Sequence, residues 1–197
     1  MRARHPSLQQ VGDVFLFSRE ALSGHVQLAG FRGAPQTVAL ICRYALDAQK
    51  QRPPLARLFA ESIVSGLYPK AYLCEMNAVN NFVLAHTRYM NDPRTVELVK
   101  RPERILRDVI AGRRPSIDCD DYVCLLAALF LAMGRRVRVV TVAFARMTFQ
   151  GNQQYSHVFL QAQEPYSKRW VVYDPVAAED TEEMLRNVKA IKYWPIA

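Results

Sequence analysis

Apolar residues recur at spacings of three and four along the first two thirds of the chain, which is the period of a helix with one buried face. Proline pairs and a turn at Asn91–Pro93 divide this stretch. The pattern predicts helices through Thr37–Leu46 and Leu55–Val64, over Cys74–Tyr89, and over Pro102–Ile110. Residues 1–34 show no sustained period apart from a strand-like Val14–Phe17, so we expect little order there.

The most apolar segment predicts a central helix over Cys119–Met133. Asp118 precedes it as a good N-cap, and Gly134 follows as a C-terminal stop. Because the segment is apolar almost all round, we expect it to be buried on every side. Its longest apolar run, Tyr122–Met133, has 12 residues. A bilayer requires roughly 20, so no transmembrane helix is expected.

After residue 135 the pattern becomes that of β-strands, rich in β-branched and aromatic residues. It predicts strands Arg136–Ala145, Ser156–Gln163 and Trp170–Asp174, a turn at 164–167, and a small helix Glu179–Ala190. The fold class expected is α+β: a central helix packed on an antiparallel sheet, with an N-terminal helical region. We assign residues 1–76 to that region and 77–197 to the core, and expect one compact unit.

The composition of the chain indicates a folded globular protein. The chain has 197 residues, of which 50% are hydrophobic and 22% charged, so it can bury a core and disorder is excluded as its main state. Its first residues lack the apolar stretch of a secretory signal, so we expect a cytoplasmic protein.

The net charge of +8 permits acidic partners, including nucleic acid. Seven basic and three acidic residues fall within 94–114, but no aromatic residue does. Non-specific nucleic-acid grooves combine basic side chains with aromatic stacking platforms. A solvated surface is therefore the favoured interpretation of this stretch, and binding of nucleic acid is the third alternative.

The four cysteines are separated by 32, 45 and 5 positions, spacings that match no zinc motif. We expect no metal, no cofactor and no disulfide. Cys42, Cys74 and Cys124 are interpreted as small hydrophobic residues. Cys119 differs, because it begins a helix at a polar boundary, and the amides of a helix N-terminus lower the pKa of a thiol.

Two further polar residues interrupt apolar strands: His157 at a strand start and Asp174 at a strand end. An imidazole near a thiolate can take and return a proton, and a carboxylate on its far nitrogen fixes its orientation. A hairpin turned near Pro165 would place residue 157 opposite roughly residue 173. Cys119, His157 and Asp174 are therefore the candidate catalytic residues.

The acidic pair Asp120–Asp121 opposes this chemistry, since carboxylates facing the sulfur would raise the pKa of the thiol. At about 100° per residue, Asp121 lies about 200° around the helix from Cys119. Asp120 is the closer neighbour.

Three runs together resemble a known family: Asp118–Tyr122 with the apolar helix behind it, Ser156–Leu160, and Trp170–Pro175. They are similar to the transglutaminase-like core of the papain-type cysteine enzymes, and most to bacterial and prophage transglutaminase-like proteins, whose central motif reads GDCDD. The resemblance spans about 77–177 and includes an upstream segment, Thr87–Pro93. Here Ile117 stands where relatives have glycine, which bears on the shape of the groove.

The resemblance implies a Cys-His-Asp triad of Cys119, His157 and Asp174 on a papain-like fold. The leading hypothesis is an acyl-transfer enzyme that forms a thioester on a protein or peptide substrate, acting as peptidase, amidase, deamidase or transglutaminase. The alternative is a non-catalytic binding or phage-structural protein that retains the scaffold. Such sites also need an oxyanion donor besides the nucleophile's own N–H. Tyr89 and Asn91 are both candidates for it.

Overall fold

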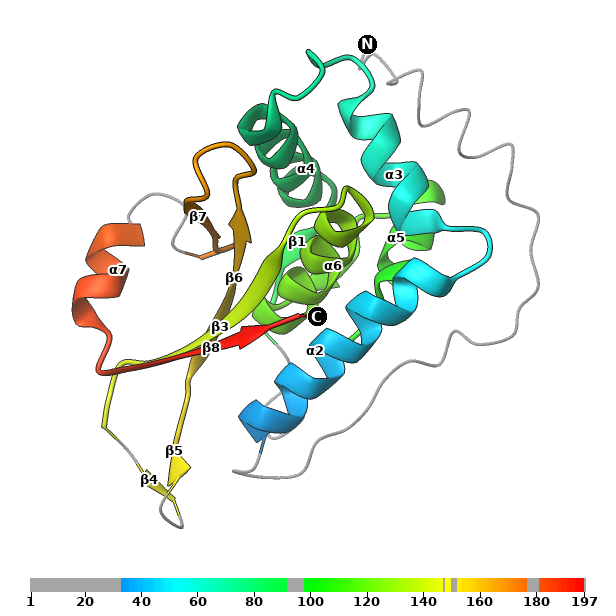
Figure 1. The fold of residues 1–197 in the computed structure, drawn as a ribbon. Coiled ribbons are helices and arrows are strands. Elements are labelled where there is room, and N and C mark those ends of the chain that lie inside the picture. The colour runs from blue at the N-terminus through cyan, green and yellow to red at the C-terminus, as the bar shows by residue number, and fades with distance from the viewer. Residues whose placement is uncertain (1–32, 92–97, 147, 150–151, 177–180, 197) are drawn as a thin grey trace.

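In the computed structural model of this chain, a group of helices lies on one side of a small sheet and a single short helix on the other (Figure 1). The structure describes residues 33–91, 98–146, 148–149, 152–176 and 181–196. The helices are α2 (Gly33–Lys50), α3 (Leu55–Val64), α4 (Tyr72–His86), α5 (Pro102–Ile110), α6 (Cys119–Ala132) and α7 (Thr181–Asn187). The predicted helices are confirmed, whereas the strand-like Val14–Phe17 lies outside the described residues. The third helix ends earlier than expected, because Arg88–Tyr89 forms strand β1.

The central helix α6 is buried on every side, as predicted. Its residues from Asp120 to Phe130 are at most 1% exposed. Helices α2, α3, α4 and α5 pack around it, and strand β6 (His157–Gln163) lies against it (Figure 1). The Asp118 carboxylate accepts a hydrogen bond from the Asp121 N–H at 3.2 Å. At the other end Gly134 has φ +71°, and the Arg135 N–H donates to the Phe130 carbonyl at 2.9 Å. These are the cap and the stop that the sequence predicts.

Four antiparallel strands form the main sheet, in the order β7-β6-β3-β8. Besides β6, they are β3 (Val137–Ala143), β7 (Trp170–Tyr173) and β8 (Ala190–Pro195). The three predicted strands are confirmed, with shorter ends. The smaller strands are β1 with β2 (Ser116–Ile117), which pair in parallel, and β4 (Thr148–Phe149) with β5 (Asn152–Gln153).

The predicted helix Glu179–Ala190 is too long, and β8 was not predicted. Helix α7 ends at Asn187, and the chain then runs back along β3, where Val140 pairs with Tyr193. Ile191 and Tyr193 are 39% and 45% exposed, so β8 lacks the buried face that a strand pattern needs. Its partner strand lies some fifty residues earlier, which no local pattern reveals.

The predicted register of the β6–β7 hairpin is wrong by three residues. Leu160, and not residue 157, lies opposite Tyr173. The turn is centred beyond Pro165, because the Glu164 carboxylate accepts hydrogen bonds from the N–H groups of Tyr166 and Ser167. The turn therefore takes more residues than assumed.

The two faces of the sheet carry different cores. A large cluster runs from Val38 of α2 through α6 to Tyr173 of β7, so it includes residues on both sides of the predicted boundary at 76. That boundary stays a prediction. On the other face Val140, Val142 and Phe159 form a smaller cluster, which α7 covers in part.

Candidate active site

The sulfur of Cys119 belongs to the first residue of α6, in a partly buried position. The first N–H groups of a helix have no carbonyl partner within it, and with the helix dipole they favour negative charge. All four cysteines lie among the described residues, and none forms a disulfide. The local setting is therefore the one that promotes a thiolate.

His157 and Asp174 are joined by a partly buried hydrogen bond. The Nε2 atom of His157 donates to Oδ2 of Asp174 at 2.7 Å, and the two side chains are 13% and 0% exposed. The other carboxylate oxygen accepts from the Val176 N–H at 2.8 Å. Continuing the β6–β7 register puts Asp174 opposite Phe159, diagonal to His157. The structure thus brings these two residues together even though the predicted register was wrong.

Tyr122 is a neighbour of Cys119 on α6 that is affected by the charge of Asp174. It lies three residues after Cys119 on α6, and residues three apart share a helix face. Burial, and then the nearby Asp174 carboxylate, raise the pKa of the Tyr122 phenol. Tyr122, one helical turn after Cys119, is therefore close enough to Asp174 to be affected by its charge.

Two asparagines of α4 accept hydrogen bonds from tyrosines that are neighbours of the candidate residues in sequence. The Tyr122 hydroxyl donates to Asn80, and the Tyr173 hydroxyl donates to Asn77 at 3.2 Å. Asn77 and Asn80 are one helical turn apart, so a single face of α4 fixes both tyrosines. The sequence interpretation missed all four residues, although the three-residue spacing from Cys119 would have pointed to Tyr122.

Strand β2 ends two residues before Cys119 in the sequence and pairs with β1. Tyr89 pairs with Ile117, and the Met90 N–H donates to the Ile117 carbonyl at 2.9 Å. Ile117, which replaces the glycine of the family motif, is 2% exposed and belongs to the core. Ile117 therefore fixes the segment that leads into α6, through its burial in the core and its pairing with Tyr89.

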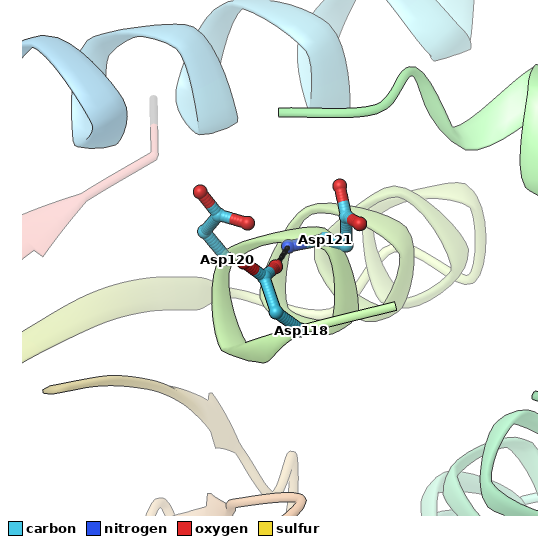
Figure 2. A group of neighbouring side chains, drawn as sticks. All are labelled: Asp118, Asp120 and Asp121. Atoms are coloured by element: carbon cyan, nitrogen blue, oxygen red, sulfur yellow. Dashed lines mark hydrogen bonds between the residues drawn. The ribbon is translucent and has the colours of Figure 1, made fainter. Parts of the chain in front are cut away.

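The acidic residues at the start of α6 are turned to another side. Figure 2 shows the side chains of Asp120 and Asp121 on the side of α6 where α2 lies. Asp121 is fully buried and accepts hydrogen bonds from the Lys100 backbone N–H at 2.6 Å and from the Lys100 ammonium. Burial and the Asp118 carboxylate raise the pKa of Asp121 to about 7, and Lys100 lowers it in opposition. The sequence places Asp121 about 200° around the helix from Cys119, and its contacts with Lys100 agree with that expectation.

The same carboxylates are the acidic group that could offer ligands to a metal ion. One oxygen each of Asp118, Asp120 and Asp121 lies within 4.8 Å of the others (Figure 2). Asp118 caps the helix and Asp121 binds Lys100, so two of the three already have protein donors. Asp118 and Asp121 therefore have roles in holding the start of α6 that do not depend on a metal ion.

Comparisons with known proteins bear on the fold. A family model described as the transglutaminase-like superfamily matches residues 57–175, more than half of the chain. A search of curated proteins finds no match. Among the described residues, no helix is long and apolar enough to cross a membrane.

Two solved structures resemble the chain at low identity. One is a proposed protease from Parabacteroides distasonis, with 14% identity, a TM-score of 0.49, and coverage of 79% of this chain and 31% of that one. The other is a proposed cysteine protease from Cytophaga hutchinsonii, with 15% identity, a TM-score of 0.46, and coverage of 81% and 46%. The chain therefore spans less than half the length of either protein.

Proposed function

Because the chain belongs to the transglutaminase-like superfamily, we propose that it is a thiol-dependent acyl-transfer enzyme whose triad is Cys119, His157 and Asp174. The observation that carries this proposal is the hydrogen bond of 2.7 Å between His157 and the buried carboxylate of Asp174. The electrostatic effect of Asp174 on Tyr122, which lies three residues after Cys119 on α6, supports a short separation between the thiol and this pair. A surface histidine without a chemical role has no need of a buried carboxylate on its ring.

The roles follow from the atoms. Asp174 occupies Nε2 of His157, so Nδ1 is the ring atom that can serve the Cys119 sulfur. His157 takes the thiol proton, and the thiolate attacks an amide carbonyl carbon. The carbon–nitrogen bond breaks, the imidazolium returns the proton to the leaving amine, and a thioester remains on Cys119. The steps need these three side chains and no cofactor.

Resolution of the thioester decides the reaction type. Water, deprotonated by His157, gives a free carboxylic acid and restores the thiol, as in a peptidase, amidase or deamidase. A second amine gives a new amide, as in a transglutaminase. A protein or peptide is the substrate that we propose in either case.

Substitution of the triad tests the proposal. With p-nitrophenyl acetate as acyl donor, Cys119→Ala and His157→Ala should each lose about 10³-fold or more in catalytic turnover, because triad members act as a unit. Asp174→Asn should leave a larger residual rate. Adding dansylcadaverine and a glutamine-rich protein separates capture by an amine from hydrolysis.

Cys74→Ala is the matched control, because Cys74 is an exposed cysteine of α4 that is not part of the proposed triad. It should keep the wild-type rate. Equal rates for Cys119→Ala and wild type would contradict the proposal and leave the alternative, a binding or structural protein that retains the scaffold.

A further inference from the structure

Attack of a thiolate on a carbonyl puts negative charge on the carbonyl oxygen, and that charge needs hydrogen-bond donors. The backbone N–H of Cys119, at the N-terminus of α6, is one donor suited by position. A second donor must come from another element. It must lie near Cys119, be reachable from outside and stay protonated while the nucleophile is ionised.

Tyr89 is fixed beside Cys119 by backbone pairing. The N–H groups of Arg88 and Met90 donate to the carbonyls of Pro115 and Ile117, each at 2.9 Å. Tyr89 thus lies opposite Ile117, two residues before the thiol. Neighbouring strands are about 4.8 Å apart, which is within the reach of a tyrosine side chain.

Charged groups of the proposed site affect the phenol of Tyr89. Burial raises its pKa, and Cys119, Asp118 and Asp174 raise it further. Such electrostatic effects fall off with distance, so they agree with the backbone pairing that brings Tyr89 near the start of α6. The phenol therefore stays neutral and keeps its proton to donate.

We propose that the Tyr89 hydroxyl donates a hydrogen bond to the oxyanion formed when Cys119 attacks its substrate. This inference rests on the proposed function. Tyr89 is 41% exposed, so a substrate oxygen can reach it. Asn91, the other candidate, is exposed and lies beyond the last residue of β1, where the pairing with β2 has ended.

Two reactions of the same sulfur separate this role from an effect on the thiol itself. Acylation by p-nitrophenyl acetate passes through an oxyanion, whereas alkylation by iodoacetamide is a displacement at carbon and forms none. In Tyr89→Phe, acylation should slow by about 10- to 100-fold, somewhat less than the loss of a fully buried donor. The alkylation rate of Cys119 and its pH profile should stay as in wild type.

Tyr68→Phe is the matched control, because Tyr68 is 87% exposed and follows α3. It should change neither reaction. Equal slowing of both reactions in Tyr89→Phe, or a shifted alkylation profile, would show that Tyr89 acts on the thiolate and would overturn the inference. Unchanged acylation would also overturn it. A wild-type Cys119 that reacts with neither reagent would refute the proposed function, and the inference with it.

Discussion

The surroundings of each sulfur set its reactivity. Cys124 is fully buried, with its Sγ atom 3.8 Å from the Ile41 carbonyl oxygen, and Cys42 is partly buried. Burial raises the pKa of Cys42, and it raises the pKa of Cys124 well above the usual range. Both stay protonated to higher pH and are poor nucleophiles there. Cys74 is the most accessible of the four.

Iodoacetamide should therefore modify Cys119 first between pH 6 and 7, before the more exposed Cys74. The helix N-terminus and a protonated His157 both favour the thiolate, whereas accessibility alone favours Cys74. Peptide mass mapping over pH 6–9 gives the rate at each cysteine. Cys42 and Cys124 should react only toward alkaline pH, because their pKa values are raised.

His157→Ala should slow alkylation of Cys119 at pH 6 and leave Cys74 unchanged. If Cys74 reacts before Cys119 across the whole range, the thiol is not activated. The scaffold alternative would then be the better account of the chain.

Single residues could be predicted where a polar side chain interrupts an apolar pattern. Cys119, His157 and Asp174 stand out in this way, and their candidate roles stay predictions. Lys100 gives no such signal, since its partner Asp121 lies 21 positions later and only the packing of the loop before α5 brings them together. Partners of this kind depend on tertiary structure, which local patterns do not contain.

At the scale of elements, the start of α6 depends on an ion pair. Lys100 binds both oxygens of Asp121, and their side chains are 20% and 0% exposed. Lys100→Met should destabilise the protein by about 1–2 kcal/mol near pH 7–8, because the pKa of Asp121 is already about 7 and the buried carboxyl can take up a proton when its cation is lost. Urea unfolding measures the change. Adding Asp121→Asn should recover part of the loss, and a Lys100→Met variant as stable as wild type would contradict the pairing.

Long elements were predictable because each has enough residues to show a pattern. Helix α6 is an apolar run with a cap and a stop, and strands β3 and β6 are runs rich in β-branched and aromatic residues. Strands β1 and β2 have two residues each, too few for any period. Strand β8 forms by pairing with β3, which is distant in the sequence, so the residues of β8 alone do not predict a strand.

At the scale of the whole molecule, part of the net charge of +8 comes from basic residues that contact other parts of the protein. Several basic residues of the 94–114 stretch have partners within the protein. The Arg101 guanidinium lies 4.3 Å from the centre of the Tyr44 ring, Arg113 pairs with Asp108, and Arg114 donates to the Thr87 carbonyl at 2.8 Å. Fewer cations remain available to contact phosphates than the sequence suggests.

Short DNA and RNA should therefore bind more weakly than micromolar at about 150 mM salt, since phosphate-driven binding falls steeply with salt. Fluorescence anisotropy measures this directly. Submicromolar affinity under these conditions would favour the nucleic-acid alternative.

The central position of α6 also has a consequence for folding. The helix carries Cys119, yet His157 begins β6 and Asp174 follows β7, and the contact of Tyr173 with Asn77 spans 96 positions. Distant contacts form late, because the intervening chain must first be ordered. A partly folded molecule would hold a sulfur that can be oxidised but has no base beside it. Acyl-transfer activity should therefore return with the final folding phase, and a nascent chain should be inert toward amides in its surroundings.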